Sequence, residues 1–253
     1  MKKFYGWLLR TIPRPILIRL SYVFRWFAPL FLRGNNVECP VCEKKFRKFL
    51  PYGTFQRDNV LCPNCLTLER HRLFWLYLRQ KTDFFTKPHN VLHIAPEQCF
   101  YKTFRNMKSI KYTTADLVSP LADVKMDLHH MPFDDNSYDV IFCNHVLEHV
   151  EDDHQCMKEL FRVLSPGGFA IMQVPIDYTR SKTYEDKSIT SEADREKHFW
   201  QKDHVRLFGM DYPDKLSAVG FKVEHNKMAA EIPAELADRY RLQKEEILFV
   251  CRK

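Results

Sequence analysis

From residue 90 onward, short apolar runs alternate with longer stretches in which apolar residues recur at helical spacing. The runs include VLHI at 91–94, the stretch IKYTTADL at 110–117, VIFC at 140–143 and GFAIMQVPI at 168–176. Apolar runs of four to eight residues separated by helical segments predict parallel strands joined by crossover helices. We therefore expect an α/β domain over residues 83–253, with ligands bound beyond the carboxyl ends of its strands.

Residues 1–34 follow a different pattern, an apolar and aromatic run interrupted by Arg14, Arg19, Arg25 and Arg33. The arginines leave no window of about 20 apolar residues for a transmembrane helix, and no small-residue cleavage pattern indicates a signal peptide. We expect an amphipathic helical segment that lies on an anionic membrane surface. Its apolar face would contain Trp7, Leu8, Ile16, Leu17, Leu20, Phe24 and Phe27.

Two alternatives remain for this segment. It can pack on the protein's own body or on a partner subunit, with the arginine side chains reaching out to solvent. Nucleic acid is a weaker alternative, because the basic residues of the segment stand among apolar ones. The net charge of +7 is concentrated in the N-terminal part of the chain, which indicates that the basic segment contacts a partner or a charged surface.

Residues 35–82 contain a cysteine pattern typical of zinc ribbons, followed by an amphipathic helix that bridges to the next domain. Two C-x2-C pairs, CPVC and CPNC, are separated by nineteen residues. Four thiolates complete the closed tetrahedral shell of structural zinc, which stabilises a module with little core of its own. The expected Zn²⁺ ligands are Cys39, Cys42, Cys62 and Cys65.

The other four of the eight cysteines stand singly in apolar segments, as buried thiols do in a reducing compartment. We therefore expect a cytoplasmic protein, peripheral on the inner face of the membrane. The charged stretch from Glu69 to Arg72 begins the bridging helix. Its side chains either face an active cleft or cap and solvate the helix.

Two carboxylates follow strands of the expected sheet. Asp116 ends the second strand, where a carboxylate can accept hydrogen bonds from both ribose hydroxyls of a nucleoside. Asp127 follows the third strand and can accept from an adenine amino group, with Leu128 framing the ring. Either residue alone can be a helix cap or a turn residue, but their order along the chain favours a nucleoside site.

The stretch from Met131 to Ile176, MPFDDNSYDVIFCNHVLEHVEDDHQCMKELFRVLSPGGFAIMQVPI, closely resembles class I S-adenosylmethionine-dependent methyltransferases of the small-molecule type. The resemblance covers about residues 90–253 and implies a Rossmann-like seven-stranded sheet that ends in a helix and a strand pair. It also implies S-adenosylmethionine as cofactor, with the strand end at Asn144 and His145 near its methionine moiety. The cofactor residues would be Ala95, Pro96, Glu97, Asp116, Leu117, Asp127, Leu128, His129 and Asn144.

The first motif departs from that family. The family has a glycine-rich loop where this chain has Ala95, Pro96 and Glu97, and no glycine occurs between residues 54 and 166. Glycine in such a loop lets the backbone approach the ligand closely. We interpret the stretch as a variant loop in which Glu97 meets the cofactor's amino group. The alternative is a domain that has lost cofactor binding.

A long polar segment between the fifth strand and the last helix is expected to shape the acceptor site. It resembles a segment of a bacterial subgroup associated with surface-polysaccharide biosynthesis, with DHVR at 203–206 as the matching stretch. His204 can serve as a general base and Arg206 can hold an anionic substrate group. Alternatively, both are structural anchors of this segment. His145 is a second candidate base, or a residue that shapes the cofactor site.

Three functions fit these features. The first is methylation of a small-molecule or glycan-like acceptor at a membrane surface. The second is RNA methylation, with the zinc ribbon and the positive charge binding RNA. The third is a non-catalytic scaffold with a degenerate cofactor loop. Binding of the cofactor separates the third from the other two, and salt-sensitive RNA binding separates the second from the first.

Overall fold

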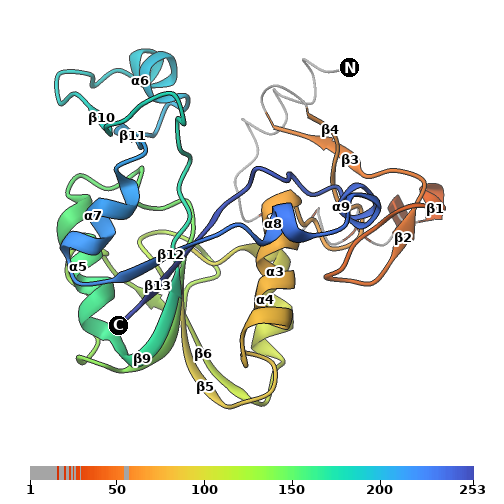
Figure 1. Cartoon of the computed structure of the whole chain (residues 1–253), viewed down its shortest axis with the longest axis horizontal. Helices are drawn as coiled ribbons and strands as arrows, with labels where there is room; N and C mark the ends of the chain where they lie inside the picture. The colour runs from red at the N-terminus through yellow and green to blue at the C-terminus, as the bar shows by residue number, and fades with distance from the viewer. Residues whose placement is uncertain are drawn as a thin grey trace. The chain divides into compact units, whose positions relative to one another are not determined.

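The chain divides into two compact units (Figure 1). The structure is a computed structural model that describes residues 16, 20, 23, 25, 27, 28, 30–53 and 57–253. The first unit comprises residues 1–85 and 227–246, and the second comprises residues 86–226 and 247–253. The stretch 227–246 falls inside the range expected for the α/β domain, yet it packs with the N-terminal unit.

The second unit is built on a seven-stranded sheet, as the resemblance implies. Its strand order is β12-β13-β9-β8-β5-β6-β7, in which β5 to β9 are parallel and β12 and β13 form the antiparallel closing pair. The strands are β5 (His89–Ile94), β6 (Ile110–Asp116), β7 (Val124–Lys125), β8 (Tyr138–Cys143), β9 (Leu164–Ile171), β12 (Lys222–Asn226) and β13 (Leu248–Arg252).

Helices cover both faces of this sheet. Figure 1 shows α5 (Asp153–Val163) and α7 (Tyr212–Ala218) on one face and α4 (Gln98–Arg105) on the other. The central strand β8 is apolar and fully buried over Val140–Cys143, because helices exclude water from both of its faces. Between β9 and α7 lies the polar segment, with β10 (Tyr184–Glu185), α6 (Glu192–Phe199) and β11 (Arg206–Leu207).

The first unit surrounds the four cysteines. It contains two small hairpins, one of β1 (Arg33–Glu38) with β2 (Lys45–Phe46) and one of β3 (Leu50–Tyr52) with β4 (Arg57–Leu61). Their core joins Leu32, Val37, Phe46 and Phe49 to three of the cysteine side chains. The unit also contains α3 (Glu69–Lys81), where the sequence predicts the bridging helix, together with α8 (Met228–Glu231) and α9 (Ala234–Tyr240).

Arg72 of α3 holds this unit together from the inside. Its guanidinium is fully buried and donates to the carbonyl oxygens of Val60 and Thr67 at 2.9 Å. It also donates to the carbonyl of Tyr240 at 2.6 Å and to that of Arg241 at 3.1 Å. Arg72 therefore joins the hairpins to the end of α9, a structural role rather than a place in an active cleft.

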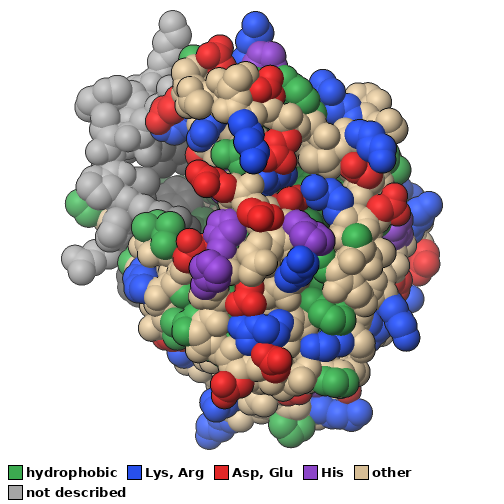
Figure 2. All heavy atoms as spheres, turned by 90° about the vertical axis from the view of Figure 1, so that its left-hand side faces the viewer, with side chains coloured by type: hydrophobic (Ala, Val, Ile, Leu, Met, Phe, Trp, Pro, Cys, Tyr) green, Lys and Arg blue, Asp and Glu red, His purple; other side chains and the backbone are tan. Residues whose placement is uncertain are grey.

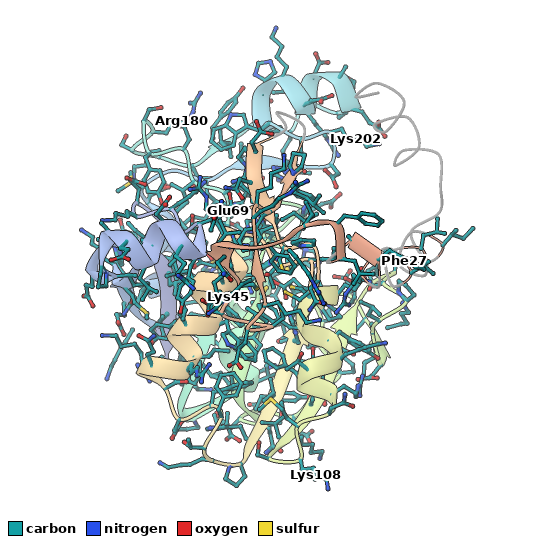
Figure 3. All side chains as sticks on the ribbon, turned by 90° about the vertical axis from the view of Figure 1, so that its right-hand side faces the viewer. Phe27, Lys45, Glu69, Lys108, Arg180 and Lys202 are labelled. Atoms are coloured by element: carbon teal, nitrogen blue, oxygen red, sulfur yellow. The ribbon has the colours of Figure 1, made fainter. Side chains whose placement is uncertain are left out.

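The described residues between 16 and 31 are helical. Ile16, Leu20 and Phe27 from the expected apolar face are each about half exposed, and Figure 3 labels Phe27. Trp7, Leu8, Leu17 and Phe24 lie outside the described residues. Among the residues that the structure does describe, no helix is both long enough and apolar enough to cross a bilayer.

Candidate active site

The glycine-less loop after β5 adopts the backbone conformation that glycine would favour. Ala95 has a φ of 50°, in the left-handed region, and its N–H donates to the carbonyl of Ala115 at 2.9 Å. This conformation costs an L-residue other than glycine about 1–2 kcal/mol. The tight turn is thus retained without glycine, and Pro96 is buried directly after it.

Glu97 joins the ends of β5 and β8 through a chain of hydrogen bonds. One carboxylate oxygen accepts from Nδ2 of Asn144 at 3.2 Å, and the other accepts from Nε2 of His93. Since Nε2 of His93 donates, its Nδ1 accepts from the hydroxyl of Tyr112 at 2.8 Å. Glu97 and Asn144, two of the predicted cofactor residues, are therefore in direct contact. His93 was missed in the sequence because a histidine inside an apolar strand gives no signal.

Asp116 ends β6 at the same edge of the sheet. Its Oδ1 accepts from the backbone N–H groups of Val118 at 2.7 Å and Ser119 at 2.5 Å. Its Oδ2 has no hydrogen-bond partner in the described part of the chain, so one face of the carboxylate remains available. The adjacent Leu117 is 66% exposed and Val118 is 77% exposed. A carboxylate beside uncovered apolar side chains is suited to a ligand with both a polar and a flat apolar part.

Asp127 follows β7, and its surroundings favour the charged form. Its Oδ1 accepts from the backbone N–H of His129 at 2.9 Å and from Nδ1 of the same residue at 2.6 Å. These bonds lower the pKa of Asp127. His129 also accepts at Nε2 from the N–H of Asp152 at 3.2 Å. It therefore links two loops at this edge, while Leu128 between them is buried.

The loop after β8 carries His145 in an unusual backbone conformation. Its φ is 56°, and its N–H donates to the carbonyl of Gln173 at 2.7 Å. Nδ1 of its ring lies 3.3 Å from Oε1 of Glu148. Backbone strain of this kind is concentrated at functional sites. The loop thus presents His145 and Glu148 together, next to Asn144 at the end of β8.

The segment after α6 brings His204 to the same loop. His204 is buried, its Nδ1 donates to the carbonyl of Phe199 at 3.0 Å, and its ring meets that of His149 edge to face at 4.8 Å. Burial lowers the pKa of His204, so the ring is neutral and able to accept a proton. Figure 2 shows histidine side chains among acidic and basic ones on the face that lies to the left in Figure 1.

Arg206 is fully buried, and its guanidinium binds carbonyl groups of the same loop. Its guanidinium donates to the carbonyls of Leu147 at 2.7 Å, Val150, and Glu151 at 2.8 Å, and it pairs with Glu185 at 3.2 Å. A guanidinium with this many internal acceptors has little capacity left for a substrate anion. These contacts support the alternative in which Arg206 anchors the polar segment.

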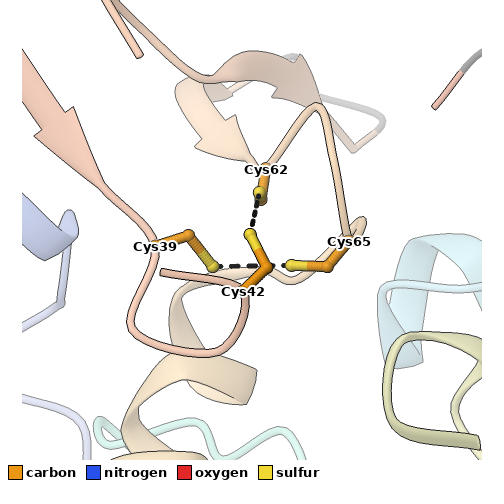
Figure 4. A group of neighbouring side chains, drawn as sticks. All are labelled: Cys39, Cys42, Cys62 and Cys65. Atoms are coloured by element: carbon orange, nitrogen blue, oxygen red, sulfur yellow. Dashed lines mark hydrogen bonds between the residues drawn. The ribbon is translucent and has the colours of Figure 1, made fainter. Parts of the chain in front are cut away.

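The four cysteines converge in the first unit (Figure 4). The sulfurs of Cys39 and Cys65 lie 3.4 Å apart, and those of Cys42 and Cys62 lie 3.7 Å apart. These separations are close to those between ligands that share one tetrahedral ion. The hydroxyl of Thr67 lies 3.2 Å from the Cys39 sulfur and 3.1 Å from that of Cys65. All four cysteines are free thiols and their sulfurs lie close together, an arrangement that could hold one metal ion.

A comparison with protein families matches part of the second unit. Residues 90–172 match the family model described as a methyltransferase domain. The ubiquinone/menaquinone biosynthesis C-methyltransferase UbiE of Idiomarina loihiensis is 34% identical over 65 residues, which are 24% of this chain and 26% of that protein. This chain therefore spans about a quarter of that curated relative.

Two solved structures resemble the fold. A S-adenosylmethionine-dependent methyltransferase from Mesorhizobium loti has a TM-score of 0.50 at 16% identity, covering 71% of this chain and 97% of that one. The [4+2]-cyclase SpnF has a TM-score of 0.53 at 14% identity, covering 93% and 96%. The second unit thus has the Rossmann-like methyltransferase fold. Because a cyclase shares it, the fold alone does not determine the reaction.

Proposed function

We propose that the protein transfers a methyl group from S-adenosylmethionine to a small-molecule or glycan-like acceptor. The observation that supports this most is the edge of the sheet at which three successive strands each end in a carboxylate. Glu97 follows β5, Asp116 ends β6 and Asp127 follows β7. The matched methyltransferase domain model covers these strand ends.

The residues at this edge fit such a cofactor in chemical type. Glu97 and Asn144 offer a carboxylate and an amide for an amino-acid moiety, and Asp116 offers an oxygen for ribose hydroxyls. Asp127 can accept from an adenine amino group beside Leu128. When bound, S-adenosylmethionine supplies a methyl group on a positively charged sulfur. The protein then has mainly to hold an acceptor in line with that methyl group.

An acceptor hydroxyl or amine must also lose a proton. His145 and His204 are the candidate bases, both near the end of β8. The lowered pKa of His204 keeps its ring neutral near pH 7, as a base must be. Because His204 is buried, the acceptor's proton would have to reach its imidazole through an intervening group. About a third of the His145 side chain is exposed, but its Nε2 is buried and has no hydrogen-bond partner in the described part of the chain.

The four-cysteine cluster is proposed to bind one structural Zn²⁺. Three of its cysteines pack in the apolar core of the first unit, so the ion would stabilise the fold and leave no position open for catalysis. Thiols must lose their protons to bind the metal. Hydrogen bonding of the Cys65 thiol to Cys39 and Cys42 favours its protonated form and raises its pKa. Zinc would therefore displace protons from the cluster when it binds.

The N-terminal segment is proposed to attach the protein to an anionic membrane surface on the cytoplasmic side. Ile16, Leu20, Val23 and Phe27 recur three or four residues apart, on one face of a helix, and each is 48–59% exposed. Leu30 and Phe31 continue the exposed apolar side chains at 58% and 76%. An apolar helix face beside arginines is typical of interfacial binding.

Labelling with S-adenosylmethionine that carries a radioactive methyl group tests the function and the class of acceptor. The zinc-loaded protein is incubated with a cell extract, with and without prior ribonuclease treatment, and the label is followed into small-molecule, lipid, glycan and RNA fractions. Ribonuclease-resistant label in a small-molecule or glycan fraction, absent with Asp116→Ala, is the expected result. Label that ribonuclease removes would replace this acceptor class with RNA.

A further inference from the structure

Three metal-ligand side chains converge beside the loop after β8, away from the four cysteines. Glu148 and His149 belong to that loop, and His204 comes from the polar segment more than fifty residues later. Their ligand atoms all lie within 4.8 Å of one another. We propose that Glu148, His149 and His204 form a second metal site, which binds a divalent transition-metal ion such as Zn²⁺, Fe²⁺ or Co²⁺.

The two histidines are oriented as metal-binding histidines usually are. Nδ1 of His149 donates to the carbonyl of Asp203 at 3.1 Å, and Nδ1 of His204 donates to the carbonyl of Phe199 at 3.0 Å. Each ring therefore carries its proton on Nδ1 and keeps a lone pair on Nε2. A backbone carbonyl that holds the distal nitrogen of a ligand histidine is a recurrent feature of metal sites.

Glu148 supplies the negative charge. Its side chain is only 2% exposed, and its Oε2 is buried with no hydrogen-bond partner in the part of the chain that the structure describes. Oε1 lies 3.3 Å from Nδ1 of His145, which would orient the carboxylate. Burying a carboxylate oxygen without a partner is costly. A bound cation accounts for an oxygen that is otherwise unsatisfied.

Hydrogen bonds join the backbone of the loop after β8 to the polar segment that carries His204. The N–H of Val205 donates to the carbonyl of Glu148 at 2.9 Å, directly beside His204. Arg206 then binds the carbonyls of Leu147 and Glu151, on either side of Glu148 and His149. The ligand-bearing loop and the polar segment are thus fixed to each other before any ion binds.

Two imidazoles and one carboxylate favour a borderline divalent ion over Mg²⁺ or Ca²⁺, which prefer oxygen ligands. Ligands about 2.0–2.2 Å from one Zn²⁺ lie about 3–4 Å apart. The ligand atoms of the three side chains lie up to 4.8 Å apart, slightly farther than this. The side chain of His149 is 34% exposed, so it can rotate to bring its ligand atom closer to the other two. Three protein ligands leave at least one coordination position open, unlike the closed set of four cysteines.

The open position indicates what the ion would do. Asn144, next to the loop, is the proposed contact for the cofactor's methionine moiety, so the ion would lie near the methyl donor. If the proposed methyl transfer is correct, an acceptor oxygen bound at the ion would lose its proton more readily. A metal-bound Nε2 of His204 cannot also accept a proton, so His145 is the remaining candidate base when the ion is bound. This consequence rests on the proposed function, whereas binding of the ion itself does not.

Metal binding by the full chain tests the site. Protein that holds one Zn²⁺ per chain by elemental analysis is titrated with Co²⁺, and absorption and heat are recorded. The expected result is a second ion per chain with weak d–d absorption and without the intense sulfur-to-metal bands of a thiolate site. His149→Ala, at an exposed position that folding should tolerate, is expected to weaken this binding at least about tenfold. Glu148→Gln should do the same.

His154→Ala is the matched control, since His154 is an exposed histidine five residues away that does not belong to the cluster. It should bind Co²⁺ as the unchanged protein does. No second ion, or equal affinity in His149→Ala and the unchanged protein, would overturn the site. Cofactor titration of the same samples separates the two proposals, because loss of S-adenosylmethionine binding leaves the metal result intact.

Discussion

Replacing Ala95 with glycine tests the loop that lacks the family's glycines. Ala95 has a φ of 50°, a conformation that costs an L-residue about 1–2 kcal/mol. Ala95→Gly removes this cost. The substitution also gives the unfolded chain more conformational freedom, which lowers the stability of the folded state by about 0.4–1 kcal/mol. We expect a net stabilisation of about 0.5–1 kcal/mol. For a chain of this size, that raises the melting temperature by about 1–4 °C.

Differential scanning calorimetry of the zinc-loaded protein measures the change. Ala218→Gly, at the exposed end of α7 with ordinary helical geometry, is the control and should destabilise by up to about 1 kcal/mol. Affinity for S-adenosylhomocysteine should be unchanged or higher in Ala95→Gly. Equal destabilisation by the two substitutions would refute the left-handed conformation of Ala95, and with it the explanation of the variant loop.

Four further predictions concern other parts of the molecule. Asp116→Ala should weaken S-adenosylhomocysteine binding in calorimetry by about 1–3 kcal/mol, while Asp134→Ala, at the opposite end of the sheet, should not. Arg72→Met removes the buried guanidinium that donates to four carbonyls and should lower the free energy of unfolding by at least about 3 kcal/mol in urea; Arg79→Met, on the exposed face of α3, should change it by less than about 1 kcal/mol. Cys62→Ser should lower the zinc content by one ion per chain in elemental analysis, whereas Cys99→Ser, outside the cluster, should leave the zinc content unchanged. Deletion of residues 1–34 should abolish sedimentation with anionic liposomes without changing cofactor affinity, and a full-length protein that ignores such liposomes would contradict membrane attachment.

The central strands β5 and β8 could be predicted because they are short apolar runs whose residues are mostly buried. The closing strand pair was expected from the family resemblance, because β12 is polar and largely exposed. Asp116 and Asp127 could be singled out from the pattern of apolar runs, since each stands at a strand end, whereas Glu97 was expected only from the family resemblance. Their convergence is a property of parallel strands, whose carboxyl ends meet at one edge. The four cysteines were predictable for a similar reason, because each C-x2-C pair is local.

Other features depend on contacts that periodicity does not encode. Residues 227–246 contain ordinary helical patterns, and nothing in them indicates that they pack with the N-terminal unit. Arg72 stands in a helix where charge normally predicts exposure, yet it is fully buried because backbone carbonyls surround it. The meeting of Glu148 and His149 with His204 requires the path of the polar segment, which its sequence does not specify.

Titration of the zinc-loaded chain with S-adenosylmethionine and S-adenosylhomocysteine in a calorimeter tests the central claim most directly. The account predicts one binding site per chain with micromolar affinity for both compounds. A folded, zinc-loaded protein that binds neither compound would contradict it, and would favour a scaffold that retains the fold without the cofactor.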